Sequence, residues 1–107
     1  LGVLGESVRL PADGEAVQRL ATMQVDVLDQ TGARLGGGTG ADVLGNPLNA
    51  VLWLAASLRA EGKSLNNGDL LSLGSFSALL PPRAGSIITV RYTGLSFVPV
   101  EVSVRFE

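Results

Sequence analysis

The last residues of the chain constrain its fold most strongly, because apolar and polar residues alternate there without a break. Every second residue from position 98 to position 106 is apolar, and the residues between them are Pro99, Glu101, Ser103 and Arg105. Successive side chains of a strand point to opposite faces, so this period of two predicts an antiparallel strand with one face in water. Proline offers no backbone donor, so Pro99 places the start of this strand at a sheet edge or a bulge.

Five further stretches have the composition or the period of strands, at residues 8–10, 23–28, 33–35, 70–73 and 87–92. The second of them places Met23, Val25 and Val27 at every other position, which is typical of a half-buried strand. The sequence Asp-Gln-Thr-Gly at 29–32 predicts a turn, so 23–28 and 33–35 form a hairpin. Residues 15–20 fit one helical turn and a loop equally well.

A glycine cluster, Gly-Gly-Gly-Thr-Gly at 36–40, follows the hairpin. It lacks the Lys-Ser/Thr ending of a phosphate-binding loop. It also lacks the spacing of a dinucleotide fingerprint, in which a helix starts at the last glycine. We therefore interpret it as a flexible connector near a site or surface.

One principal helix is predicted at about 46–61. Asn46 is a good N-cap, Pro47 suits the first helical position, and Gly62 suits the stop. The spacing places one face on Leu48, Val51, Leu52, Ala55, Leu58 and Arg59. Trp53 and Leu54 fall off that face, so the helix is apolar nearly all round. Such a helix needs a partner on its second face, either chain beyond this segment or another subunit; simple surface packing of Trp53 is the alternative.

Together these elements predict an α+β, β-rich fold with one principal helix, and the length predicts one domain or part of one. The chain has 107 residues, of which 46% are hydrophobic and 17% charged, a globular composition. The net charge is −2 and no basic run occurs, so nucleic-acid binding has no electrostatic support. No apolar run approaches the ~18 residues that a membrane span needs, so we expect no membrane partner.

Cysteine and histidine are both absent. No disulfide holds this fold and no thiol nucleophile exists, which fits a reducing compartment and a cytoplasmic location. Without histidine the chain alone cannot build a Ser-His-Asp triad or a histidine-containing zinc site. Any general base supplied by this chain must be a carboxylate, a lysine or water.

The acidic residues show no spacing of a hard-metal site. Asp26 and Asp29 lie three apart and point to opposite faces of their strand, while Asp69 has the place of a turn residue. We expect each acid to be structural or solvated.

The end of the predicted strand 70–73 is a candidate ligand site. Gly74 and Ser75 follow it directly. A glycine lets backbone approach a ligand closely, and a hydroxyl with a backbone N–H can bind a carboxylate or an enolate oxygen. The alternative is a turn with no ligand.

Four motifs in order resemble the 2-keto-4-pentenoate hydratase family. "VLGNPLNAVLWLA" (43–55) is similar to its Leu-Gly-His/Asn-Pro segment, and "LNNGDLLSLGS" (65–75) to its Gly-Asp-aliphatic-aliphatic-x-Thr-Gly strand end. "AGSIITVRY" (84–92) and "VSVRF" (102–106) resemble its last two strands, and the hairpin "MQVDVLDQTGARLGGGTG" fits as well. The family belongs to the fumarylacetoacetate hydrolase superfamily, together with the 4-oxalocrotonate decarboxylases.

The resemblance implies a mixed β-sandwich or roll of the fumarylacetoacetate hydrolase type. It also implies addition of water to a 2-hydroxy-2,4-dienoate in aromatic catabolism, giving a 4-hydroxy-2-oxo acid. The small-molecule partner is then a 2-oxo acid or dienoate, and the protein a homo-oligomer. Mg²⁺ or Mn²⁺ would stabilise the enolate as a Lewis acid. The family's metal ligands and catalytic residues lie upstream of the matched segment, so we expect none of either in this chain.

What the resemblance carries over is Gly74 and Ser75, as substrate-binding residues at the carboxylate end of the substrate. Leu73 stands where many relatives have threonine, and Asn46 where many have histidine, which leaves the substrate open. Decarboxylation or C–C hydrolysis on the same scaffold is an alternative. A non-catalytic oligomerisation or binding module is another, supported by the apolar helix and the lack of catalytic groups.

The chain opens on Leu1 within strand-like sequence. We therefore expect residues 1–107 to be the C-terminal portion of a hydratase-type catalytic domain, inactive alone. A processed native terminus is the alternative.

Overall fold

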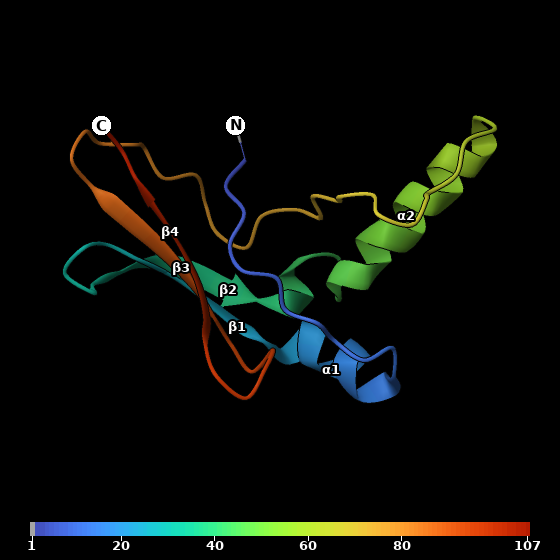
Figure 1. The fold of residues 1–107 in the computed structure, drawn as a ribbon, viewed down its shortest axis with the longest axis horizontal. Helices are drawn as coiled ribbons and strands as arrows, with labels where there is room; N and C mark the ends of the chain where they lie inside the picture. The colour runs from blue at the N-terminus through green and yellow to red at the C-terminus, as the bar shows by residue number, and fades with distance from the viewer. Residues whose placement is uncertain (1) are drawn as a thin grey trace.

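The structure is a computed structural model that describes residues 2–107, and its centre is one four-stranded antiparallel sheet (Figure 1). The strand order is β2-β1-β3-β4. The strands are β1 (Gln24–Leu28), β2 (Arg34–Thr39), β3 (Ile87–Thr93) and β4 (Val100–Arg105). The helices are α1 (Gly14–Thr22), a single 3₁₀ turn η1 (Gly40–Asp42) and α2 (Pro47–Ala60). The predicted α+β, β-rich class with one principal helix is confirmed.

The two faces of the sheet differ sharply in chemistry. Val25 of β1 pairs with Tyr92 of β3, and Val27 pairs with Val90 two residues along, so these side chains share one apolar face. The opposite face is polar. Asp26, Arg91 and Glu101 lie side by side across three strands, and Arg91 Nε donates to Glu101 Oε1 at 2.6 Å. The wet face predicted for the last strand is confirmed, and Pro99 directly precedes β4, which is an edge strand.

Helix α1 is longer than the sequence pattern suggested. The Asp13 side chain accepts a hydrogen bond from the Ala16 amide at 2.9 Å, and Arg19 pairs with Glu15 one turn away. The strand predicted at 8–10 is wrong, because those residues have no ladder partner and lead directly into the cap of α1.

The glycine cluster is not a flexible connector. Residues 36–38 lie within β2, where Gly36 pairs with Val27 and Gly38 with Val25. Backbone pairing to β1 holds them in place, and their lack of side chains leaves room above the sheet. The predicted hairpin is confirmed, with β2 longer than residues 33–35.

The strand predicted at 70–73 is wrong. Between α2 and β3 the described chain has neither helix nor strand and runs back from the end of α2 to the sheet (Figure 1). Asp69 acts in a turn as expected, accepting from the Asn66 amide at 2.8 Å. Leu70 is 77% exposed, and no strand edge lies alongside to complete a ladder. The aliphatic run at 70–73 is therefore not sufficient to make this segment a strand.

Helix α2 occupies almost the predicted range and projects away from the sheet (Figure 1). Asn46 accepts from the Leu48 amide at 3.0 Å, and its side-chain amide donates to the Val17 carbonyl at 2.8 Å, which joins the start of α2 to α1. Leu52 and Trp53 are 67% and 66% exposed. The spacing places Leu52 on one face with Leu48 and Val51, but Leu52 is exposed whereas those two are half-buried. The second apolar face of α2 is uncovered.

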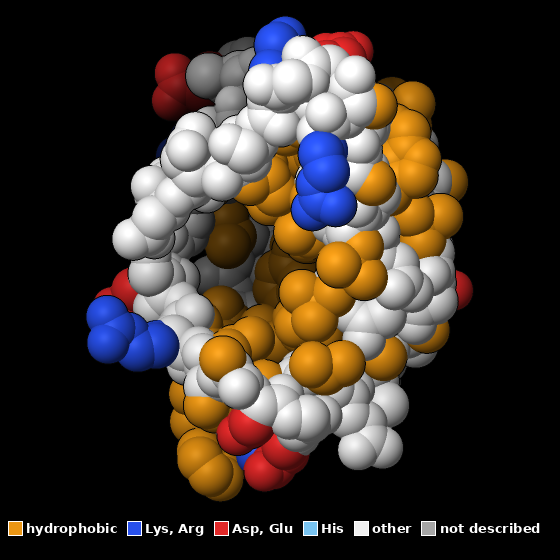
Figure 2. Space-filling view, turned by 90° about the vertical axis from the view of Figure 1, so that its right-hand side faces the viewer, with side chains coloured by type: hydrophobic (Ala, Val, Ile, Leu, Met, Phe, Trp, Pro, Cys, Tyr) orange, Lys and Arg blue, Asp and Glu red, His pale blue; other side chains and the backbone are white. Residues whose placement is uncertain are grey.

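Hydrophobic side chains gather around a hollow on the side toward which α2 projects (Figure 2). Among residues 2–107, no helix combines the length and the apolar character needed to cross a bilayer.

Candidate functional site

The segment Gly74–Ser77 lies over the apolar face of the sheet and closes a hollow of about 180 Å³. Strands β1 and β3 form the floor, and the segment forms the wall. The lining residues are Val25, Val27, Gly74, Ser75, Phe76, Ser77, Val90 and Tyr92. Both residues predicted to bind substrate therefore lie together at one hollow. Ligand binding there stays a prediction.

Glycines in β2 allow the segment to come this close to the sheet. A side chain at Gly38 would overlap the Asp42 carboxylate, and its Cβ would lie 2.6 Å from the Phe76 carbonyl oxygen. At Gly36 a Cβ would meet only Ser77 Cβ, at 3.6 Å, an ordinary contact. The role of Gly38 was missed in the sequence. Glycine inside a strand is the signal that could have found it, since it marks close approach of another backbone.

Gly74 has a conformation that favours glycine. Its φ is +137°, and an added Cβ would lie 3.3 Å from Val43 Cγ1. The close-approach argument made for Gly74 from the sequence thus has a structural counterpart. The neighbour at that position is the Val43 side chain.

The polar groups of the segment suit an anionic oxygen. Ser75 Oγ donates to the Ser77 carbonyl at 2.9 Å, and Ser77 Oγ donates to the Ala78 carbonyl at 3.0 Å. Within residues 2–107 neither the Gly74 nor the Ser75 amide N–H donates a backbone hydrogen bond. An amide donor without a backbone acceptor can bind a carboxylate, whereas the Ser75 hydroxyl can do so only by leaving the Ser77 carbonyl; neither group supplies a general acid or base.

Tyr92 is a second residue that sequence reasoning missed. Its ring packs edge to face with Phe76, with the ring centroids 6.2 Å apart. Burial raises the pKa of the Tyr92 phenol, so it stays a neutral donor at physiological pH. The alternation through β3, with Ile88 and Val90 on the same face, was the available signal.

Several carboxylates of the described chain are engaged away from this hollow. A hydrogen bond from Arg34 lowers the pKa of Asp26, and one from the Thr31 hydroxyl lowers the pKa of Asp29. Glu101 pairs with Arg91 on the polar face of the sheet. In the part of the chain that the structure describes, no three acidic residues come together as metal ligands. The residues present do not fit a metal site.

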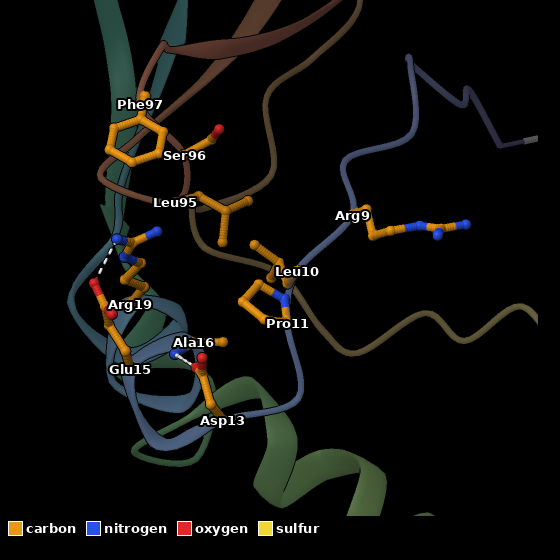
Figure 3. A pocket seen from close by; sticks show the side chains of 10 residues that line it. All are labelled: Arg9, Leu10, Pro11, Asp13, Glu15, Ala16, Arg19, Leu95, Ser96 and Phe97. Atoms are coloured by element: carbon orange, nitrogen blue, oxygen red, sulfur yellow. Dashed lines mark hydrogen bonds and ion pairs between the residues drawn. The ribbon is translucent and has the colours of Figure 1, made fainter.

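A larger hollow, of about 340 Å³, lies between α1 and the loop before β4 (Figure 3). Arg19 sits over the Phe97 ring at 5.7 Å and is bound to Glu15, and the Asp13 carboxylate caps α1. Arg9 points away from the other lining residues (Figure 3). The charged side chains of Asp13, Glu15 and Arg19 thus stabilise α1 and its contact with Phe97. We therefore interpret this hollow as packing rather than a ligand site.

Comparison with known proteins gives consistent relatives, although no family model matches the chain. The chain is 39% identical over 72 residues to the TodF product hydratase of Pseudomonas putida, and the matched region covers 67% of this chain and 27% of that protein. A 2-keto-4-pentenoate hydratase of Paraburkholderia xenovorans is 34% identical over 74 residues, 69% of this chain and 28% of that one. A 4-oxalocrotonate decarboxylase of Pseudomonas sp. is 38% identical over 80 residues, 75% of this chain and 29% of that one.

A solved structure agrees with these sequences. The 4-oxalocrotonate decarboxylase from Pseudomonas putida G7, complexed with magnesium and adipate, matches with a TM-score of 0.73 and 37% identity. The match covers 83% of this chain and 32% of that chain. The same enzyme has also been solved with calcium and acetate. The chain therefore spans less than a third of the length of these relatives.

Proposed function

Because this chain is homologous to part of the 2-keto-4-pentenoate hydratases and 4-oxalocrotonate decarboxylases, we propose that it belongs to a lyase of the same type. The proposed reaction is the addition of water to a 2-hydroxy-2,4-dienoate. Residues 1–107 would be the C-terminal portion of its catalytic domain. The short span of the match, less than a third of each relative, supports this assignment.

One observation about the site carries the proposal. Gly74 and Ser75, singled out from the sequence, line a hollow on an apolar sheet face and offer unused amide N–H groups. A dienoate is complementary to this arrangement, because it has an apolar body and a carboxylate at one end. The segment would bind the carboxylate, and Val25, Val27 and Val90 would exclude water from the hydrocarbon part.

Proton transfer is proposed to come from residues upstream of this chain. The hollow is lined by no histidine, carboxylate or lysine within the described residues. The decarboxylase structures contain magnesium or calcium, and we propose Mg²⁺ or Mn²⁺ for the complete enzyme, with upstream ligands. The acids of this chain do not fit a metal, so no step of the reaction is assigned to it here.

Two other functions have specific support. Decarboxylation has support from relatives as similar as the hydratases, at 38% identity. An interaction module, and with it a homo-oligomer, has support from the exposed Leu52 and Trp53 on α2. C–C hydrolysis on the same scaffold remains an alternative without an observation of its own.

The test uses the complete source protein with Mg²⁺ and a 2-hydroxydienoate. Ser75→Ala should raise KM or lower turnover by about tenfold, the effect of losing one hydrogen bond to a charged group, without unfolding the protein. Ser72→Ala is the matched control, because Ser72 is exposed and does not line the hollow. Unchanged kinetics for Ser75→Ala would remove this residue from the site. Release of CO₂ from 4-oxalocrotonate without hydration would favour the decarboxylase.

The assignment of the chain as a portion of a larger domain has its own test. Intact mass spectrometry of the native source protein should give a mass well above the 11.0 kDa of this chain. A native mass equal to that of the chain would end the hydratase proposal, because the chain lacks the groups that the reaction needs.

A further inference from the structure

The turn that follows α2 contains the one Asn-Gly pair of the chain, Asn67–Gly68. The Asp69 amide donates to the Asn66 carbonyl at 3.1 Å, which closes a β-turn with Asn67 and Gly68 at its two central positions. Gly68 has a φ of +94°, as the third position of a type II turn requires. Both central residues are exposed. The turn therefore presents an asparagine side chain and the amide of the following glycine to water.

The two neighbouring groups of this pair are not engaged elsewhere in the described chain. Among residues 2–107, neither the Gly68 amide nor the Asn67 side chain forms a hydrogen bond, although both residues on either side of them do. A Cβ built on Gly68 would meet no atom within 4 Å, so the space around it is open. Without a side chain, Gly68 does not hinder the approach of its own nitrogen to the Asn67 side-chain carbonyl. These two groups are placed to react with each other.

The other three asparagines each lack one of these conditions. Asn46 is followed by a proline, whose nitrogen carries no hydrogen to give up. Asn49 lies within α2, where backbone amides are held in helical hydrogen bonds, and its side chain donates to a backbone carbonyl at 2.8 Å. Asn66 is exposed, but the residue after it carries a side chain. Asparagine is a thermolabile residue in general, and here the conditions for reaction come together at Asn67.

We propose that Asn67 is a site of spontaneous covalent modification, in which its side chain cyclises onto the Gly68 nitrogen and then hydrolyses. The Gly68 nitrogen attacks Asn67 Cγ, so that a new C–N bond forms and the Cγ–Nδ2 bond breaks. Nδ2 leaves as ammonia and takes up the proton that the Gly68 N–H loses. Water then opens the five-membered imide, at the side-chain carbonyl to give an aspartyl residue or at the main-chain carbonyl to give an isoaspartyl residue. Water is the one co-reactant, and the inference does not depend on the proposed function.

The modification should open the turn that carries it. The Asp69 carboxylate accepts from the Asn66 amide at 2.8 Å, which adds a second hydrogen bond across the turn. An isoaspartyl residue lengthens the backbone between Asn66 and Asp69 by one carbon atom, so both bonds across the turn must stretch. Either product also places a new carboxylate two residues from that of Asp69, and like charges repel.

The test incubates the complete source protein at mildly alkaline pH, which promotes loss of the amide proton. Replacement of the amide group by a carboxyl group should raise the mass of the peptide that contains Asn67 by about 1 Da, and fragmentation should place the change at this residue. A methyltransferase specific for isoaspartyl residues should label the same peptide. Asn46 and Asn49 are internal controls and should keep their mass. An Asn67 that stays unmodified, or that reacts no faster than Asn49, would overturn the proposal.

Two variants test the roles of the two residues. Asn67→Gln keeps a side-chain amide but would need a six-membered ring, so it should block the reaction. Gly68→Ala adds a methyl group beside the attacking nitrogen and should slow the reaction by about tenfold or more. Ser64→Ala, exposed and outside the turn, is the matched control and should react at the normal rate. The same mass gain in Asn67→Gln, or a normal rate in Gly68→Ala, would refute the proposed step.

Hydrogen exchange measures the effect on the turn. The amides of Asn66 and Asp69 should exchange faster in the incubated protein than in the fresh protein, because both donate across the turn. Incubated Asn67→Gln should show no such change. Equal exchange in incubated and fresh protein, with the mass gain present, would contradict the predicted opening of the turn.

Discussion

Phe76 and Tyr92 meet edge to face, with ring centroids 6.2 Å apart and ring planes at 87°. Phe76 belongs to the irregular segment between α2 and β3, and Tyr92 to the middle of the sheet. Such an aromatic pair contributes about 0.5–1.5 kcal/mol beyond its buried area. It therefore fixes the Gly74–Ser77 segment, and with it the wall of the candidate site, to strand β3.

Removal of the Phe76 ring should loosen that wall. We expect Phe76→Ala to destabilise the complete protein by roughly 1–3 kcal/mol, below the range for a fully buried phenylalanine because Phe76 is half-buried. KM for the dienoate should rise more than kcat falls, because the wall binds and does not react. Urea unfolding and steady-state kinetics measure the two effects. Tyr92→Phe keeps the ring contact and is the control; an equal loss in this variant would contradict the assignment of the effect to the ring pair.

Gly38 should tolerate no side chain. In Gly38→Ala the new Cβ would overlap the Asp42 carboxylate and crowd the Phe76 carbonyl, so either the segment or η1 must move. We expect a loss of roughly 1–3 kcal/mol in the free energy of unfolding, as for other overpacked sites. Gly36→Ala, in the same strand and on the same face, should lose less than half as much. Equal stability of the two variants in urea would refute the close approach described here.

The pKa of Asp26 should depend on Arg34. The hydrogen bond from Arg34 lowers this pKa below its ordinary value of 3.8, so the ion pair stabilises the folded state above the unfolded-state pKa. That contribution is lost as the pH falls through the folded-state pKa. Because the pair is partly exposed, it should amount to only about 0.2–1 kcal/mol.

Arg34→Met should return the Asp26 pKa toward its ordinary value, measured by carboxyl NMR titration. Arg91→Met should raise it less, because Arg91 acts on Asp26 only through the weaker charge interaction. A larger shift in Arg91→Met would contradict the hydrogen-bond assignment.

Trp53 should be covered in the complete protein. In this chain Trp53 is 66% exposed on an uncharged stretch of α2, next to exposed Leu52. We expect the Trp53 contribution to fluorescence, taken as the difference between the protein and Trp53→Phe, to resist quenching by iodide in the complete protein. Free quenching would mean that nothing packs on this face. In that case Trp53→Gln should also leave the oligomer size unchanged in size-exclusion chromatography, and the prediction that Trp53 is covered would be wrong.

Local sequence rules predicted the regular elements well. The alternation in β4, the hairpin around 29–32 and the capped helix at 46–61 are all decided by short-range patterns, and the structure confirms them. Helix α1 was less clear, although the Asp13 cap and the Glu15–Arg19 pair were visible in the sequence. Its short apolar pattern did not separate it from a loop.

The errors arose where a partner across the fold decides the conformation. Residues 36–38 became a strand because β1 pairs with them, and residues 70–73 did not because no strand edge lies beside them. Leu52 is exposed although its spacing groups it with the half-buried Leu48 and Val51. The close approach of the Phe76 carbonyl to Gly38 is likewise a long-range contact, and a single sequence does not show it.

The strand order also has a kinetic consequence. Strands β1 and β2 form one local hairpin and β3 and β4 another, and the sheet is joined where β1 pairs with β3, for example Val27 with Val90. Strands β1 and β3 are far apart in the sequence, and closing so long a loop slows folding, because the chain entropy is lost before the contact is gained. On the ribosome the first hairpin must wait for almost the whole segment to be synthesised. Until then its apolar face, Val25 and Val27 included, is open to chaperones and to misassembly.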